Sequence, residues 1–132
     1  MNIQALLKEA VQKQASDFHI VVGLPPSLRV HGELSMMSDK LITAEESKEA
    51  IYAVMNTEQQ EALEKNWELN FAMALPGLGR FRVNAYFAKG NVEAAFRIIS
   101  IAPKTMEELG LPAVVADLSR RPSGLVLITG PA

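Results

Sequence analysis

No cysteine occurs among the 132 residues of the chain, so the sequence excludes a disulfide framework and a thiolate metal site. No apolar run approaches the ~20 residues that a membrane-spanning helix needs. Glycine and proline number only 8 and 7, too few for a collagen-like or broadly disordered chain. The formal net charge of −2 argues against a general binder of nucleic acid or of anionic membranes. The N-terminus mixes charged and apolar side chains, which argues against a signal peptide.

What is present is an ordinary globular composition, with 48% hydrophobic and 21% charged residues. The length allows one domain of common size, or one domain with a short extension. These properties predict a cytoplasmic domain with a sizeable core. One feature is unusual: Gly130-Pro131-Ala132 follows directly after a strongly apolar run, and a natural domain rarely ends at such a point.

The N-terminal third of the chain carries one helix signal and several strand signals. Apolar residues spaced three and four apart predict a helix over residues 3–11. A short apolar run predicts a strand over residues 17–22. The sequence then predicts a small hairpin over residues 28–36, which turns at Gly32.

Two capping boxes predict the next two helices. Thr43 is followed three residues later by Glu46, which is the pattern that begins an α-helix. Thr57 with Gln60 repeats the pattern and predicts a second short helix that ends near Asn66.

Three strands with alternating apolar and polar residues follow, over residues 69–75, 80–87 and 92–99. Turn residues separate them, so consecutive strands are expected to pair antiparallel. Together with the earlier helices, these strands predict an α+β fold.

The sequence changes character at Pro103. A third capping box begins at Thr105, and the apolar run at residues 125–129 is typical of a buried strand. We therefore divide the chain into an α+β domain over residues 1–102 and a second part over residues 103–132.

The last two strands of the α+β domain predict one hairpin register. A turn over residues 88–91 places four apolar pairs on one face of the sheet, which supports this register. The same register places Arg82 directly opposite Arg97 on the other face. The four apolar pairs are Phe87 with Val92, Ala85 with Ala94, Val83 with Phe96, and Phe81 with Ile98.

Opposed arginines need an explanation, because like charges across a strand pair destabilise a sheet. An anionic group offsets the repulsion, and the candidates are an internal carboxylate, the acidic face of a partner, or a phosphate. The arginine fork suits carboxylate and phosphate better than lysine does. The alternative is that Arg82 and Arg97 are solvated, or pair with Glu93 or Glu68; spacing alone favours this alternative.

Asp17 and His19 form a D-x-H pair on one face of the first strand. The pair could hold a metal or relay a proton, but two groups do not make a metal site, and His31 is the only other histidine. A structural hydrogen bond is the favoured role. We predict no metal site, and the sequence shows no convergent nucleophile, base and orienting group.

The C-terminal residues match the beginning of a phosphate-binding loop. Such a loop reads G-x-x-x-x-G-K-[ST] directly after a buried strand. Gly130 would be its first glycine, and Pro131 and Ala132 the next two positions. A glycine and a proline after a strand occur in many turns, so this signal is weak by itself.

Seven sequence blocks in one order resemble the N-terminal half of the secretion and type IV pilus ATPases, in particular the retraction branch that drives twitching motility. The resemblance covers essentially the whole chain. The blocks are ASDFHI, GLPPSLRVHGEL, VMNTEQQ, GLGRFRVNAYF, FRII, TMEELGLP and GLVLITGP.

The resemblance implies a PAS-like antiparallel sheet with helices packed on one face, then a linker and the first strand of a RecA-like ATPase domain, cut inside its Walker A loop. It implies that Arg82 and Arg97 contact the phosphates of ATP. Gly130, Pro131 and Ala132 would begin the Walker A loop, and Leu109 would lie in a linker near the nucleotide base.

The resemblance also implies partners and a place in the cell. The full protein would be a homo-hexameric motor that uses ATP and Mg²⁺ and contacts an inner-membrane pilus platform protein. It would be cytoplasmic and peripheral at the inner face of the cytoplasmic membrane. By itself, the 132-residue chain is expected to bind no cofactor and to hydrolyse no ATP. The alternative is a free-standing PAS-like module that binds a small ligand or another protein without ATPase activity.

Overall fold

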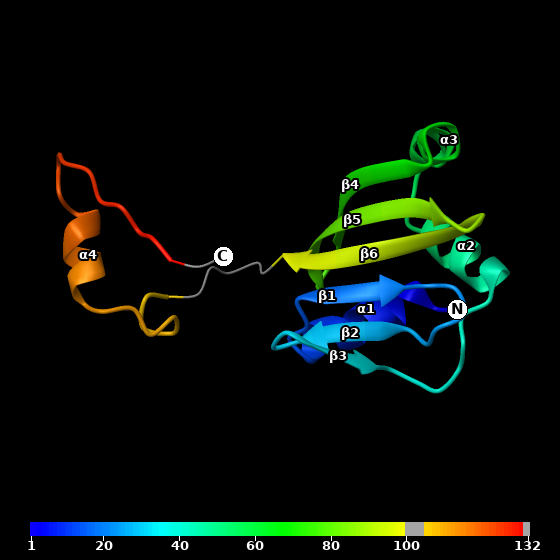
Figure 1. The fold of residues 1–132 in the computed structure, drawn as a ribbon, viewed down its shortest axis with the longest axis horizontal. Helices are drawn as coiled ribbons and strands as arrows, with labels where there is room; N and C mark the ends of the chain where they lie inside the picture. The colour runs from blue at the N-terminus through cyan, green and yellow to red at the C-terminus, as the bar shows by residue number, and fades with distance from the viewer. Residues whose placement is uncertain (100–104, 131–132) are drawn as a thin grey trace. The chain divides into compact units, whose positions relative to one another are not determined.

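A six-stranded antiparallel sheet forms the first part of the molecule (Figure 1), in the strand order β3-β2-β1-β6-β5-β4. β1 and β6 pair at its centre, so segments from the two ends of this part of the chain lie side by side. The strands are β1 Asp17–Ile20, β2 Ser27–Val30, β3 Glu33–Met36, β4 Glu68–Leu75, β5 Gly79–Ala88 and β6 Asn91–Ile99.

The computed structural model describes residues 1–99 and 105–130. The chain divides into two compact units, Met1–Ile101 and Ala102–Ala132. The first unit holds the sheet and three helices, and the second holds one short helix. The assignment of the second unit to a linker and the first strand of a RecA-like domain stays a prediction.

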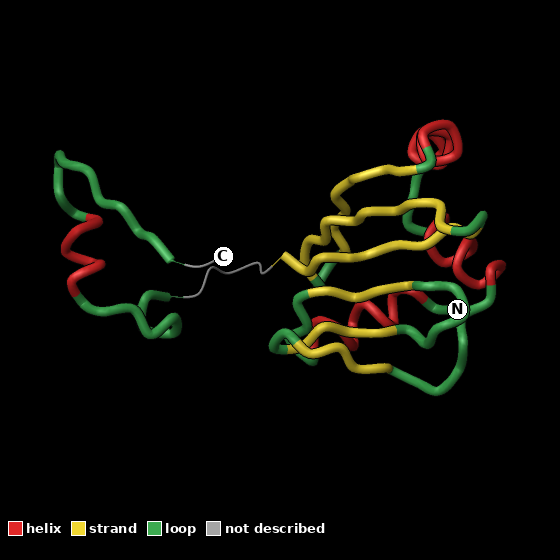
Figure 2. The backbone as a smooth tube through the Cα atoms, in the orientation of Figure 1, coloured by secondary structure: helices red, strands yellow, loops and turns green. Residues whose placement is uncertain are grey.

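Three helices complete the core of the first unit (Figure 2): α1 Ile3–Gln12, α2 Ala44–Tyr52 and α3 Thr57–Asn66. α1 and α2 each bury one side of the helix in the core, because their apolar residues recur at helical spacing, whereas α3 buries Leu63 alone. The α+β class and the antiparallel sheet are therefore confirmed. Fully buried core side chains include Leu7, Ile51 and Leu63 from the helices and Phe18, Leu28, Phe81 and Phe96 from the strands.

The helix starts confirm one predicted capping box and correct the other. At α2, the hydroxyl of Thr43 accepts from the Glu46 amide at 3.2 Å, as predicted. At α3 the predicted cap is wrong by one residue. Asn56 is the N-cap and accepts from the Gln59 amide at 2.8 Å. Asparagine is a better N-cap than threonine, which explains the shift.

The β5–β6 hairpin has the predicted register. Lys89 and Gly90 both adopt positive φ, at 52° and 80°, as a two-residue hairpin turn requires. Arg82 lies opposite Arg97. The four apolar pairs are Phe87 with Val92, Ala85 with Ala94, Val83 with Phe96, and Phe81 with Ile98.

The second unit departs from the sequence prediction near its beginning. The predicted capping box forms, since the Thr105 amide donates to Glu108 at 2.7 Å, but a turn follows it rather than a helix. The helix α4 spans Val114–Ser119. The apolar run at residues 125–129 pairs with no strand in the described ranges, and Ile128 is 90% exposed, so its assignment to the first strand of a further domain stays a prediction. A strand needs a neighbour to bond its backbone, and the described part of this unit offers none.

Among residues 1–99 and 105–130, none of the helices combines the length and the apolar character that a membrane crossing requires.

Leu28 and Leu34 offer a matched test of the core. Leu28 on β2 is fully buried, whereas Leu34 on the adjacent β3 is 56% exposed. Leu28→Ala should lower the free energy of unfolding by about 2–5 kcal/mol, because it leaves a cavity in a packed core. Leu34→Ala should change it by less than about 0.5 kcal/mol. Urea unfolding measures both, and equal losses would contradict this assignment of the core face.

Candidate functional site

The second face of the sheet is polar, because alternate residues of each strand point away from the core. Arginines and asparagines lie along the strands of this face from β2 to β4, and two glutamates lie near one end of β4 and β6. The polar side chains are Asp17, His19, Ser27 and Arg29 on β1 and β2, Glu68 and Asn70 on β4, Arg80, Arg82, Asn84 and Tyr86 on β5, and Glu93 and Arg97 on β6.

Four of these side chains form a row across neighbouring strands. Asp17 pairs in register with Arg29 on one side and with Arg97 on the other, and Arg97 in turn pairs with Arg82. The row therefore holds three guanidinium groups and one carboxylate. The row keeps an excess of positive charge.

Asp17 is the most enclosed member of the row, with a side chain that is 14% exposed. Its Oδ1 accepts from Nε of Arg97 at 3.0 Å, and its Oδ2 accepts from Oγ of Ser16 at 2.9 Å. Nε of Arg29 lies 3.8 Å from the same Oδ2. Burial alone would raise the pKa of Asp17, but the hydrogen bonds from Arg97 and Ser16 outweigh it and hold the pKa below its usual value.

A small hollow of about 190 Å³ opens between Arg82 and Arg97. Arg97 is 70% exposed at its side chain, and its two Nη groups have no hydrogen-bond partner among the described residues. Within the same ranges, the Arg82 side chain forms no ion pair. The hollow is lined by Asp17, Asn70, Arg82, Asn84, Ala95 and Arg97.

Both glutamates considered as partners for the arginines are engaged elsewhere. Glu68 accepts from Nδ2 of Asn84 at 2.8 Å. Glu93 accepts from the Val22 amide at 3.3 Å. The predicted alternative pairing with Glu93 or Glu68 is therefore wrong, and the internal carboxylate is Asp17. Burial, and then the adjacent Glu93, raise the pKa of Tyr86, so its hydroxyl stays protonated at neutral pH.

His19 and Asp17 form no hydrogen bond with each other among the described residues. Its Nε2 is buried without a hydrogen-bond partner in the described part of the chain. Burial lowers the pKa of His19, and the Arg29 charge adds to this, while Asp17 opposes it. The structural hydrogen bond predicted for the pair is thus present at Asp17 and missing at Nε2 of His19.

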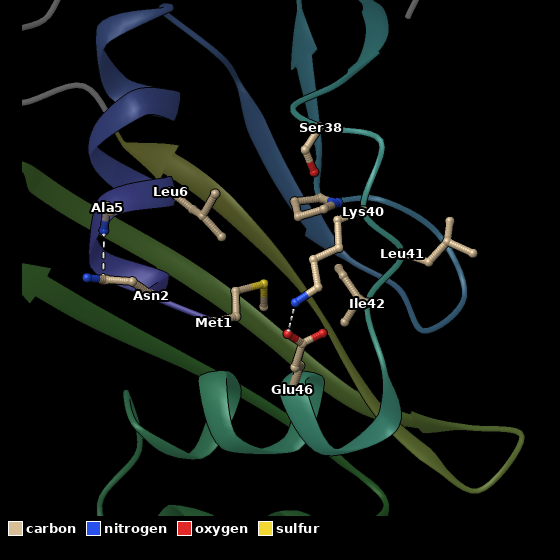
Figure 3. Close-up of a pocket in the computed structure, with 10 residues that line it drawn as sticks. Met1, Asn2, Ala5, Leu6, Ser38, Lys40, Leu41, Ile42 and Glu46 are labelled. Atoms are coloured by element: carbon tan, nitrogen blue, oxygen red, sulfur yellow. Dashed lines mark hydrogen bonds and ion pairs between the residues drawn. The ribbon is translucent and has the colours of Figure 1, made fainter.

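A second hollow of about 310 Å³ lies between the start of α1 and the segment before α2 (Figure 3). Apolar side chains such as Leu6 and Ile42 line much of it. Its lysine, Lys40, reaches the carboxylate of Glu46, and the two form an ion pair. The cation is thus already neutralised, which makes this hollow a poorer anion site than the one at Arg82 and Arg97.

The other residues predicted to bind nucleotide belong to the second unit. Leu109 lies in the turn before α4 and is 55% exposed. Gly130 ends the extended segment, and Pro131 and Ala132 lie outside the described residues. Their nucleotide-binding role stays a prediction.

Sequence reasoning missed Arg29 as a member of the row. Arg29 sits between two inward-facing residues of β2, Leu28 and Val30, so its outward direction follows from the alternation. Its place beside Asp17 depends on the β1–β2 register, for which the sequence gives no turn signal as clear as that of the β5–β6 hairpin.

The sequence and the fold both match pilus retraction ATPases. The chain is 39% identical over 131 residues to the type IV pilus retractation ATPase PilT of Pseudomonas aeruginosa, and 35% identical over 130 residues to the type IV pilus ATPase PilU of the same organism. A crystal structure of the pilus retraction motor PilT with bound ADP superposes over 99% of the chain, with a TM-score of 0.79 and 34% identity. Over almost its whole length, the chain is thus similar to a part of the type IV pilus ATPases PilT and PilU.

Two further comparisons limit what the similarity to PilT and PilU shows. No protein-family model matches the chain. The Legionella pneumophila ATPase DotB, with a TM-score of 0.65 over 89% of the chain and 21% identity, shares the fold. The chain spans 38% of the length of PilT and 34% of that of PilU.

The Asp17–Arg97 ion pair predicts how stability depends on pH. The folded pKa of Asp17 lies below that of an unfolded aspartate, about 3.9, so the ionised carboxylate stabilises the fold above about pH 4. This contribution is lost as the pH falls through the folded pKa. The unfolding free energy of Asp17→Asn should be lower than that of the wild type at neutral pH, and the two should converge in acid. Urea unfolding from neutral pH to about pH 3 measures this, and parallel curves would contradict it.

Proposed function

We propose that the chain is the N-terminal part of an ATP-hydrolysing pilus retraction motor, and that Arg82 and Arg97 bind the phosphates of the nucleotide. The observation that carries the proposal is their juxtaposition: Arg82 and Arg97 are paired across β5 and β6, and both line one open hollow. The similarity to PilT, a retraction motor crystallised with ADP, supports a nucleotide as the anion.

The charge of the row supports a multiply charged ligand. Three guanidinium groups and one carboxylate leave an excess of two positive charges on one strip of the sheet. Phosphate oxygens accept from the arginine fork in pairs and at short distance, so a nucleotide phosphate fits this excess better than a single carboxylate. Arginines placed in this way stabilise the charge that develops during phosphoryl transfer.

The proposal extends to the whole protein. The motor is a homo-hexameric ring that uses ATP with Mg²⁺, lies in the cytoplasm against the inner membrane, and engages the pilus platform protein. Residues 1–102 form its PAS-like domain. Residues 103–132 form a linker and the first strand of a RecA-like domain, in which Leu109 and Gly130 approach the nucleotide. The 132 residues contain no complete G-x-x-x-x-G-K-[ST] motif, so hydrolysis requires a further part of the protein.

Substitution of either arginine tests the proposal. In the full-length gene product, Arg82→Ala or Arg97→Ala should lower the ATPase rate at least tenfold, by removing charge from the phosphates. Arg80→Ala is the matched control, because Arg80 lies two residues from Arg82 on the same face and opposite Ile99 rather than an arginine. Steady-state phosphate release measures all three. Unchanged turnover in either Arg82→Ala or Arg97→Ala would refute the phosphate role.

The competing function is a free-standing module whose arginine face docks on an acidic partner. The same exposed guanidinium groups favour it, since carboxylates also accept from the arginine fork. The reading frame of the gene distinguishes the two functions. A frame that continues past codon 132 into G-x-x-x-x-G-K-[ST] supports the motor, and a stop codon supports the module.

A further inference from the structure

We propose that Asp17 is a positioning residue for Arg97: it holds the guanidinium group by Nε and leaves the two Nη groups free to bind the anion. This inference rests on the proposed phosphate site of Arg82 and Arg97. It assigns a role to Asp17 of the D-x-H pair, to which the proposed function gives none.

Asp17 has the rigidity that such a role needs. It lies at the beginning of β1 and is paired in register on both sides, with Arg29 and with Arg97. Ser16 donates to one carboxylate oxygen and Arg97 to the other, and the side chain is only 14% exposed. A carboxylate fixed by the backbone and by separate donors at each oxygen is a fixed point for a longer side chain.

Arg97 has the opposite character. Its side chain is 70% exposed, and its hydrogen bond to Asp17 engages Nε alone. The Nη groups therefore remain available as a two-pronged donor, which is the edge that binds phosphate oxygens in pairs. Without an anchor, ordering such a long side chain on binding costs conformational entropy. Asp17 removes part of that cost before the anion arrives.

Arg82 differs from Arg97 because no carboxylate anchors it among the described residues. It lies opposite Arg97, but within the described residues no carboxylate pairs with it. The two arginines thus differ in how they approach one ligand: Arg97 is held in place, and Arg82 is recruited by the ligand. Loss of Asp17 should therefore act through Arg97 and not through Arg82.

The sign of the effect separates positioning from simple charge. A carboxylate that acted only through its charge would repel the anion, so its removal would tighten binding. A carboxylate that positions Arg97 improves binding despite this repulsion, so its removal weakens binding. The two roles predict opposite changes in the dissociation constant.

The experiment is a titration of the full-length gene product with inorganic pyrophosphate, followed by the ¹H–¹⁵N signals of the arginine side chains. In the wild type, the Nε–Hε signal of Arg97 should exchange slowly with water, with or without pyrophosphate. Asp17→Ala should abolish that protection and raise the dissociation constant about three- to tenfold. Asp39→Ala, which removes a carboxylate from the exposed segment after β3, is the matched control and should leave both unchanged.

Two comparisons make the test specific. In an Arg97→Ala background, adding Asp17→Ala should weaken binding no further. Arg97→Lys keeps the charge but has a single nitrogen, so it cannot hold Asp17 with one nitrogen and present two others to the anion in a fixed fork. It should therefore weaken pyrophosphate binding to within about twofold of Arg97→Ala. The lysine variant also decides the question if Asp17→Ala fails to fold.

Several outcomes overturn the inference. It fails if Asp17→Ala binds pyrophosphate as well as or better than the wild type, if its loss persists in the Arg97→Ala background, or if Arg97→Lys binds like the wild type. It also fails if the Nε–Hε signal is equally protected in Asp17→Ala. A different result refutes the proposed function. If pyrophosphate shifts no side-chain signal of Arg82 or Arg97, these residues do not bind phosphate. The protection of Nε–Hε would still show whether Asp17 holds Arg97.

Discussion

The register of the β5–β6 hairpin is the constraint on which the rest of the first unit depends. One face of this hairpin supplies Phe81, Val83 and Phe96 to the core, and the other face opposes Arg82 to Arg97. A shift by one residue would move the apolar side chains into water and the arginines into the core. Burial of the core therefore keeps two like charges together, although their repulsion alone would separate them.

The pairing of β1 with β6 makes that juxtaposition tolerable. It brings Asp17 beside Arg97, eighty residues away in sequence, and the carboxylate neutralises one of the guanidinium groups. The neutralisation is partial, because Arg29 competes for the same carboxylate and Arg82 lies beyond its reach within the described residues. The remaining charge faces solvent on the polar side of the sheet, where a ligand can approach it.

Local signals carried most of the sequence prediction. The hairpin register, the first helix and the Thr43 capping box follow from short-range spacing, and the structure confirms them. The cap at Asn56 was missed because two polar residues in succession both fit the pattern. An internal carboxylate was one of three anionic groups that the sequence allowed beside the arginines, and Asp17 could not be identified as that group, since its place depends on the long-range pairing of β1. The apolar run at residues 125–129 has the composition of a buried strand but no neighbouring strand among the described residues, so its assignment to a further domain stays a prediction.

The central claim is that Arg82 and Arg97 meet a nucleotide phosphate, and a structure of the full-length gene product with a slowly hydrolysed ATP analogue tests it most directly. The account predicts guanidinium nitrogens of both residues at about 3 Å from phosphate oxygens, with Asp17 still bound to Nε of Arg97. Guanidinium groups that point to solvent or to a neighbour's carboxylates, more than about 6 Å from every phosphate oxygen, would contradict it.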